Sequence, residues 1–181
     1  YCYYKDSYTY GEISSFSLSK SDLSAWIDLS SCGNANCYIV SRPGYYRFGA
    51  VKGNSSEEVL VSTAEVLWES FGTDIPPRVG TLIQNVSYND NKIGFIVPEP
   101  FMEGNAVIAA RSAKGTILWS WHIWLTDTPD YQVYGKNDAI MMDRNLGATS
   151  AVPGDIGALG LLYQGGRKDP FLGPSSIYAG Q

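Results

Sequence analysis

The sequence predicts an all-β protein: an antiparallel β-sandwich followed by a Gly-rich, irregular C-terminal segment. Residues 35–127 alternate short apolar runs with turn residues, a pattern typical of about seven short strands. One of these runs, residues 117–125, has apolar side chains at every second position. No helix of ordinary length is visible in this region. Two facing antiparallel sheets are therefore the expected outcome.

The run 117–125 predicts the central strand of the domain. Successive strand residues point to opposite faces. One face of this run carries Ile117, Trp119, Trp121, Ile123 and Leu125. The other face carries Leu118, Ser120, His122 and Trp124. Because the first face is apolar throughout and the second is mixed, we expect the core on one side and partial cover on the other.

The remaining strands are expected earlier in the chain, over residues 37–41, 45–51, 64–70, 82–88, 92–98 and 105–111. Three of them should turn one apolar set inward, namely Tyr46, Phe48 and Ala50, then Val66 and Trp68, then Ile93, Phe95 and Val97. Turns are expected at residues 42–44, 89–91 and 112–115, which are rich in Pro, Gly, Asn and Ser.

Changes in composition suggest three parts. Residues 1–30 form an N-terminal strand or connector, residues 31–128 form the β-sandwich module, and residues 129–181 begin a second, incomplete domain. Within the last part, residues 133–142 include a segment that could be one strand, and residues 156–163 include a possible short helix. Glycines in that helix would each cost roughly 1 kcal/mol.

The bulk composition is typical of an extracellular or surface β-protein. Charged residues make up only 17% of the 181 residues, whereas Tyr occurs 13 times and Gly 19 times. A net charge of −5 argues against nucleic acid as a partner. No apolar run approaches the roughly 20 residues of a membrane-spanning helix. The first residue is Tyr rather than Met, which suggests a processed or excised piece of a longer protein.

Three cysteines, Cys2, Cys32 and Cys37, leave at least one thiol unpaired within the chain. Cys32 and Cys37 are close enough in sequence for a local disulfide. The favoured alternative is a buried thiol at Cys37, which opens an apolar run. A metal site is not expected, because the single histidine, His122, is distant in sequence and the cysteine spacing fits no zinc pattern. No cofactor is expected.

Several residues are candidates for ligand or partner contacts. The polar cluster Asp143, Arg144 and Asn145 could bind a carboxylate or sugar hydroxyls, although loop capping or an internal ion pair is the favoured alternative. Arg167 lies in a possible binding loop, for which a solvated turn is the favoured reading. Tyrosines could stack on sugar rings or pack across strands; the candidates are Tyr3, Tyr4 and Tyr45.

His122 could act as a general base or as a metal ligand. It has no sequence-adjacent partner suited to either role. A structural histidine among strand tryptophans is therefore the favoured reading.

Several stretches resemble known surface proteins. Residues 35–41, 43–44, 50–54, 65–70, 103–110 and 117–127 resemble a module of surface proteins from gut Bacteroidales. Residues 142–148, 160–164 and 166–171 are similar to the opening of the Fibrobacter succinogenes major paralogous domain. Such proteins are often described as fimbrillin-like or adhesin-like lipoproteins. The resemblance implies an Ig-like or fimbrillin-like sandwich that is exported to the outer-membrane surface and carries no catalytic residues.

The expected function is therefore that of a non-enzymatic extracellular module for adhesion or for assembly into a fimbria-like surface structure. Its partners would be other surface or fimbrial subunits. Joining by strand addition is one possibility, with the Tyr-rich residues 1–10 as the candidate donor. The alternative is a carbohydrate-binding module that captures host or dietary glycan.

Overall fold

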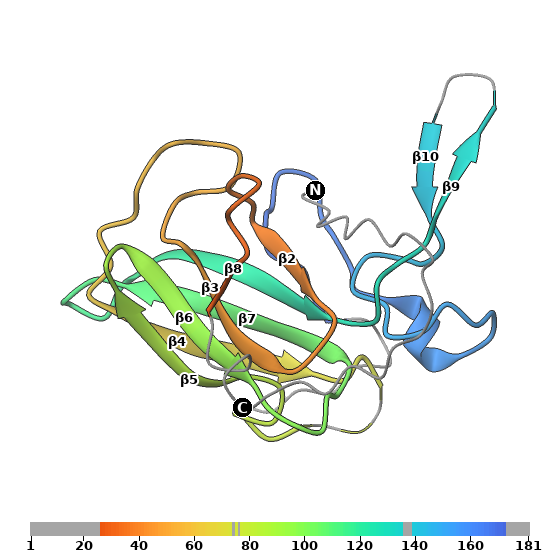
Figure 1. The fold of residues 1–181 in the computed structure, drawn as a ribbon, viewed down its shortest axis with the longest axis horizontal. Helices are drawn as coiled ribbons and strands as arrows, with labels where there is room; N and C mark the ends of the chain where they lie inside the picture. Colours follow the sequence, from red (N-terminus) through yellow and green to blue (C-terminus); the bar gives the residue numbers. More distant parts are fainter. Residues whose placement is uncertain (1–25, 74, 76, 136–138, 173–181) are drawn as a thin grey trace, which may run out of the picture.

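A computed structural model describes residues 26–73, 75, 77–135 and 139–172. Almost all of the regular structure is β, which confirms the all-β class (Figure 1). The described helical structure is one 3₁₀ turn, η2 (Ile156–Leu159). Among the described residues, no helix has both the length and the apolar character needed to cross a membrane.

The first sheet has four strands in the order β1-β3-β6-β5. These strands are β1 (Ile27–Asp28), β3 (Gly44–Gly49), β6 (Lys92–Val97) and β5 (Gln84–Asn89). β3 pairs antiparallel with β6, and β6 pairs antiparallel with β5. The short β1, within the predicted N-terminal connector, instead runs parallel to β3.

The second sheet also has four strands, in the order β2-β8-β7-β4. They are β2 (Cys37–Val40), β8 (Ile117–Leu125), β7 (Gly104–Arg111) and β4 (Thr63–Ser70). β8 lies inside this sheet, which confirms its predicted central position. The expectation of purely antiparallel pairing is wrong here too, because β2 runs parallel to β8. These two strands are far apart in sequence, so no tight turn forces them to run in opposite directions.

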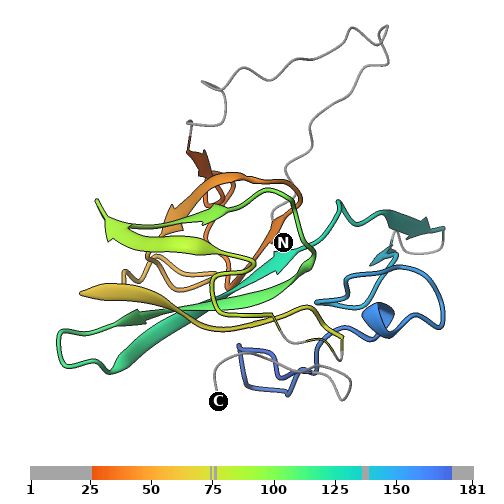
Figure 2. The same cartoon turned by 90° about the horizontal axis from the view of Figure 1, so that it is seen from below.

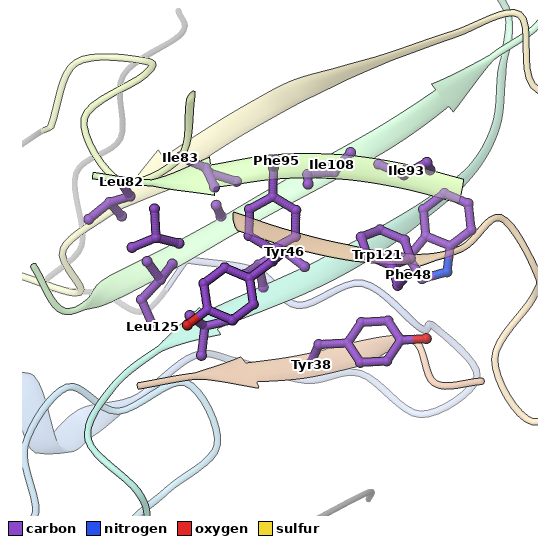
Figure 3. Close-up of a cluster of buried hydrophobic side chains, with 14 of the residues drawn as sticks. Tyr38, Tyr46, Phe48, Leu82, Ile83, Ile93, Phe95, Ile108, Trp121 and Leu125 are labelled. Carbon is purple, nitrogen blue, oxygen red and sulfur yellow. The ribbon is translucent and has the colours of Figure 1, made fainter. Parts of the chain in front are cut away.

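Side chains from both four-stranded sheets form one hydrophobic core (Figure 3). Phe48 of β3 contacts Tyr38 of β2 and Trp121 of β8, with ring centroids 5.0 and 5.2 Å apart. Trp121 is fully buried. The predicted inward sets of β3 and β6 are confirmed, and that of β8 is confirmed from Trp119 onward, since these residues lie in or against this core: Tyr46, Phe48, Ala50, Ile93, Phe95, Val97, Trp119, Trp121, Ile123 and Leu125. Ile117, predicted on the same face, is instead 45% exposed at the start of β8.

Strand β4 departs from the predicted pattern. Val66 pairs with Ile108, a core residue, but Trp68 pairs with Val107, whose neighbour across the sheet is His122 on the opposite face. A β-bulge between Val66 and Trp68 adds one residue to β4 and reverses the alternation beyond it. The prediction that these two side chains point together is therefore wrong.

Two of the predicted turns are hairpins. Asp90 and Asn91 join β5 to β6 with φ values of 48° and 59°, the left-handed conformation that Asn and Asp tolerate. Gly115 has φ 80° in the turn between β7 and β8.

Cys32 and Cys37 are both free thiols, so the local disulfide is absent from the described chain.

The chain after β8 forms a separate hairpin and then a covering segment. The strand expected within residues 133–142 is confirmed as β10 (Ala139–Met142), which pairs antiparallel with β9 (Tyr131–Tyr134). This hairpin stands away from the two larger sheets (Figure 1). The possible helix at 156–163 is only the 3₁₀ turn η2, after which Gly160 adopts φ 71°.

Residues 143–172, which we call the covering segment, lie against the outer face of the second sheet (Figure 2). The Trp124 indole Nε1 donates to the carbonyl of Ala148 at 2.9 Å, and Asn105 Nδ2 donates to the carbonyl of Gly147 at 2.9 Å. Trp124, His122 and Ser120 are consequently buried although they point away from the core. The partial cover expected for the second face of β8 comes from this segment.

Candidate functional site

The predicted contact residues lie in separate places. Tyr3 and Tyr4 fall outside the described residues. Tyr45 lies on β3, with its ring edge-on to Trp26 and the ring centroids 5.7 Å apart. Arg167 stacks on the ring of Phe171, with its guanidinium carbon 3.9 Å from the ring centroid. Asp143, Arg144 and Asn145 follow β10 directly and form one cluster.

Arg144 is held in an internal ion-pair network. Its Nε and Nη2 each donate to a carboxylate oxygen of Asp143 at 2.8 Å. Its Nη1 pairs with Asp127 and donates to Thr126 Oγ1 at 3.0 Å. These hydrogen bonds raise the pKa of Arg144 and lower that of Asp143. The Arg144 side chain is only 5% exposed. Its ion pairs with Asp127 and Asp143 link the end of β8 to the start of the covering segment.

Asn145 caps the same region. Its Nδ2 donates to the carbonyl of Ala158 at 3.0 Å, which links the start of the covering segment to η2. A pocket of about 470 Å³ opens beside these residues at the base of β10. It is lined by Met141, Met142, Asp143, Arg144, Asn145, Leu146, Ser150, Ala151 and Ala158. Both structural roles predicted for this cluster are therefore observed: Asn145 caps a loop, and Arg144 forms internal ion pairs.

A second polar cluster joins residues that are distant in sequence. The parallel register of β2 and β8 places Cys37 opposite His122. Cys37 Sγ lies 3.2 Å from His122 Nδ1, and His122 Nε2 lies 2.9 Å from Asn105 Oδ1. Asn105 Nδ2 is already a donor to the Gly147 carbonyl, so its Oδ1 must accept from Nε2–H. Nδ1 of a neutral imidazole is then free to accept the Cys37 S–H.

Burial keeps this cluster uncharged. It raises the pKa of the Cys37 thiol to about 12 and lowers the pKa of His122 to about 4, the latter against the opposing effect of the Asp169 carboxylate. A nucleophilic cysteine must be a thiolate. At neutral pH, Cys37 is a thiol and His122 a neutral base, so the arrangement is a structural hydrogen-bond chain. This agrees with the favoured reading of His122 as a strand histidine.

Cys37 and His122 are neighbours in space although they are distant in sequence. In the described part of the chain, however, no group of three or more His, Cys, Asp and Glu residues is placed to hold a metal ion. The only sequence sign of this pair is that both residues lie on strands. Which strands pair is not visible in the local pattern.

A third cluster anchors the end of the covering segment. Ser120 Oγ lies 2.9 and 2.8 Å from the two carboxylate oxygens of Asp169. Lys168 Nζ donates to the carbonyl of Ser120 at 3.0 Å and lies 4.7 Å from the ring centroid of Trp119. Lys168 also pairs with Asp169, so its amine is held between Ser120 and that carboxylate.

The β9–β10 hairpin carries the most conspicuous exposed apolar surface in the described chain. Tyr131, Val133, Tyr134, Ile140 and Met141 are each 49–64% exposed. The eight strand residues include no charged side chain. In the described structure, β9 and β10 pair with each other and with no further strand. Together with the pocket at the base of β10, this hairpin forms the candidate interaction site.

Comparison of the chain with protein-family models, with curated proteins and with solved structures finds no match.

Proposed function

We propose that this chain is a non-catalytic, extracellular module of the outer-membrane surface, which assembles with other surface subunits into a fimbria-like structure. The observation that carries the proposal is the β9–β10 hairpin. Its apolar side chains occupy both faces: Val133 pairs with Ile140 on one face, and Met141 pairs with Gln132 on the other.

A two-stranded hairpin that exposes apolar side chains on both faces is not expected to be stable by itself in water. An isolated hairpin is marginally stable at best and usually needs a third strand or a packed face. No further strand of the described structure lies beside β9 or β10, and such edge strands are a template for pairing with another chain. Native edges are commonly protected by charged residues, but residues 131–134 and 139–142 contain none. These features support strand addition at this hairpin as the mode of assembly.

The buried polar groups support a non-catalytic role. The Cys37–His122–Asn105 chain ends on the backbone of Gly147, and Arg144 is held by Asp127 and Asp143. Each cluster ties the second sheet to the segment beyond β8. Their hydrogen-bonding groups are occupied within the protein, which favours a role in fixing the hairpin's position on the body.

We further propose that the two four-stranded sheets form an Ig-like or fimbrillin-like sandwich of the Bacteroidales surface type. The shared core, in which Phe48 of one sheet contacts Trp121 of the other, supports this description. The parallel pairs β1–β3 and β2–β8 are departures from the expected antiparallel topology. Protease treatment of intact cells tests the location, since a surface module is cleaved while a cytoplasmic marker is not.

Sedimentation of the purified chain between about 1 μM and about 1 mM tests assembly through the hairpin. The double variant Ile140→Lys, Met141→Lys places a charge on each hairpin face and should weaken self-association by roughly tenfold or more. Leu60→Lys is the matched control, because Leu60 is 86% exposed and lies outside the hairpin. A wild-type chain that stays monomeric throughout, or a double variant that associates equally well, contradicts the proposal.

A further inference from the structure

Trp26 lies over the outer face of the first sheet. The residue is 43% exposed. It covers Gly94 of β6 so closely that a Cβ at that glycine would lie 2.9 Å from the ring atom Cζ3. Any larger residue at position 94 would displace the indole. Tyr45 packs edge-on against Trp26, with an angle of 72° between the ring planes.

Arg47 lies next to this aromatic pair. It pairs with Gly94 across the sheet, so its side chain leaves the same face on which the Trp26 ring rests. Its Nε is buried yet has no hydrogen-bond partner among the described residues. The buried Nε is out of reach of a ligand, but the Arg47 side chain as a whole is 43% exposed, so the rest of its guanidinium can donate hydrogen bonds to an anionic group.

The nearest carboxylate does not satisfy Arg47. Asp28 Oδ2 is 3.7 Å from Nε and already pairs with Lys92. Asp28 Oδ1 accepts from both the amide and the hydroxyl of Ser30, at 3.1 and 2.7 Å. Burial disfavours the charged form of Asp28, but the hydrogen bonds from Lys92 and Ser30 outweigh it and lower the pKa. Asp28 therefore stays ionised, and both of its carboxylate oxygens already have partners in Ser30 and Lys92.

We propose that Trp26, Tyr45 and Arg47 form a binding site for a saccharide that carries a carboxylate. The C–H face of a pyranose ring would stack on the exposed Trp26 indole, whose π face is electron-rich. The carboxylate of the same or the next sugar would take the two-pronged hydrogen bond of Arg47, the geometry for which a guanidinium is suited. Lys92 adds a second positive charge, so cations outnumber Asp28 on this patch although the whole chain is acidic.

Titration calorimetry with two acidic probes and their neutral counterparts tests this site. The pairs are 3′-sialyllactose with lactose, and trigalacturonate with its methyl ester. At least one acidic probe should bind roughly tenfold more tightly than its neutral counterpart, the difference expected for a charged hydrogen bond. Arg47→Gln should abolish that difference, and Trp26→Ala should weaken both members of the pair.

Gly94→Ala provides a second variant that leaves all three binding side chains in place but pushes the indole off the sheet, and it should weaken binding as Trp26→Ala does. Tyr134→Ala, an exposed aromatic on the separate hairpin, is the matched control and should bind as the wild type. Binding to none of the four probes overturns the proposal, as does equal affinity for acidic and neutral members or indifference to Trp26→Ala. The site does not depend on assembly, because the Ile140→Lys, Met141→Lys variant should retain wild-type affinity.

Discussion

Acidification should destabilise the folded protein through His122. The folded state holds the pKa of this imidazole at about 4, against an ordinary value of 6.5, because the ring is buried. A base whose pKa is depressed by folding contributes stability that is fully present above the unfolded pKa and is lost as the pH falls toward the folded pKa. The relevant window is therefore about pH 6.5 down to about pH 4.

The magnitude follows from the two pKa values. One pH unit corresponds to about 1.4 kcal/mol for one proton. Between pH 7 and pH 5, His122 alone should therefore lower the free energy of unfolding by about 2 kcal/mol. The hydrogen bonds give the physical reason, since a protonated Nδ1 would donate toward Cys37 Sγ, a weak acceptor.

Urea unfolding of the wild type and His122→Gln at pH 7, 6 and 5 measures this effect. The variant should be less stable at pH 7, because Cys37 loses its acceptor, but its stability should fall less steeply with acid. Carboxylates such as Asp28 and Asp143 also titrate, yet they do so in both proteins and cancel in the comparison. If the two proteins lose equal stability between pH 7 and pH 5, the buried neutral imidazole is not the cause and the reasoning is refuted.

Three further predictions follow from packing and burial. Arg144→Met should lower the free energy of unfolding by about 1–3 kcal/mol in urea, because it removes the ion pairs that hold the covering segment; unchanged stability would show that these pairs contribute nothing. Gly104→Ala should cost about 1–3 kcal/mol by overpacking, since its Cβ would lie 2.5 Å from Leu82 Cδ1, whereas Gly135→Ala, with open space around it, should be neutral in the same thermal melts. In the native protein, iodoacetamide should label the exposed Cys32 and spare Cys37, whose burial raises the thiol pKa to about 12; peptide mapping that finds both labelled equally would contradict this.

Local patterns in the sequence were enough to predict most strands and their inward faces. In β8, the alternation that starts at Ile117 identified Trp121, Ile123 and Leu125 as core residues. The Asp90–Asn91 turn likewise marked a hairpin, because few residues adopt positive φ without strain. Such features depend only on side-chain period and backbone sterics, which act over a few residues.

Long-range contacts were decided by the tertiary structure alone. Nothing near Cys37 indicates that it pairs with a strand 85 residues later and meets His122 there. The bulge in β4 is equally hidden, because one inserted residue reverses Trp68 without changing the local composition. The unsatisfied Arg47 becomes visible only when Gly94, from another strand, brings Trp26 beside it. Strand alternation states which side chains share a face, whereas the choice of partner strand depends on how the whole chain buries its apolar surface.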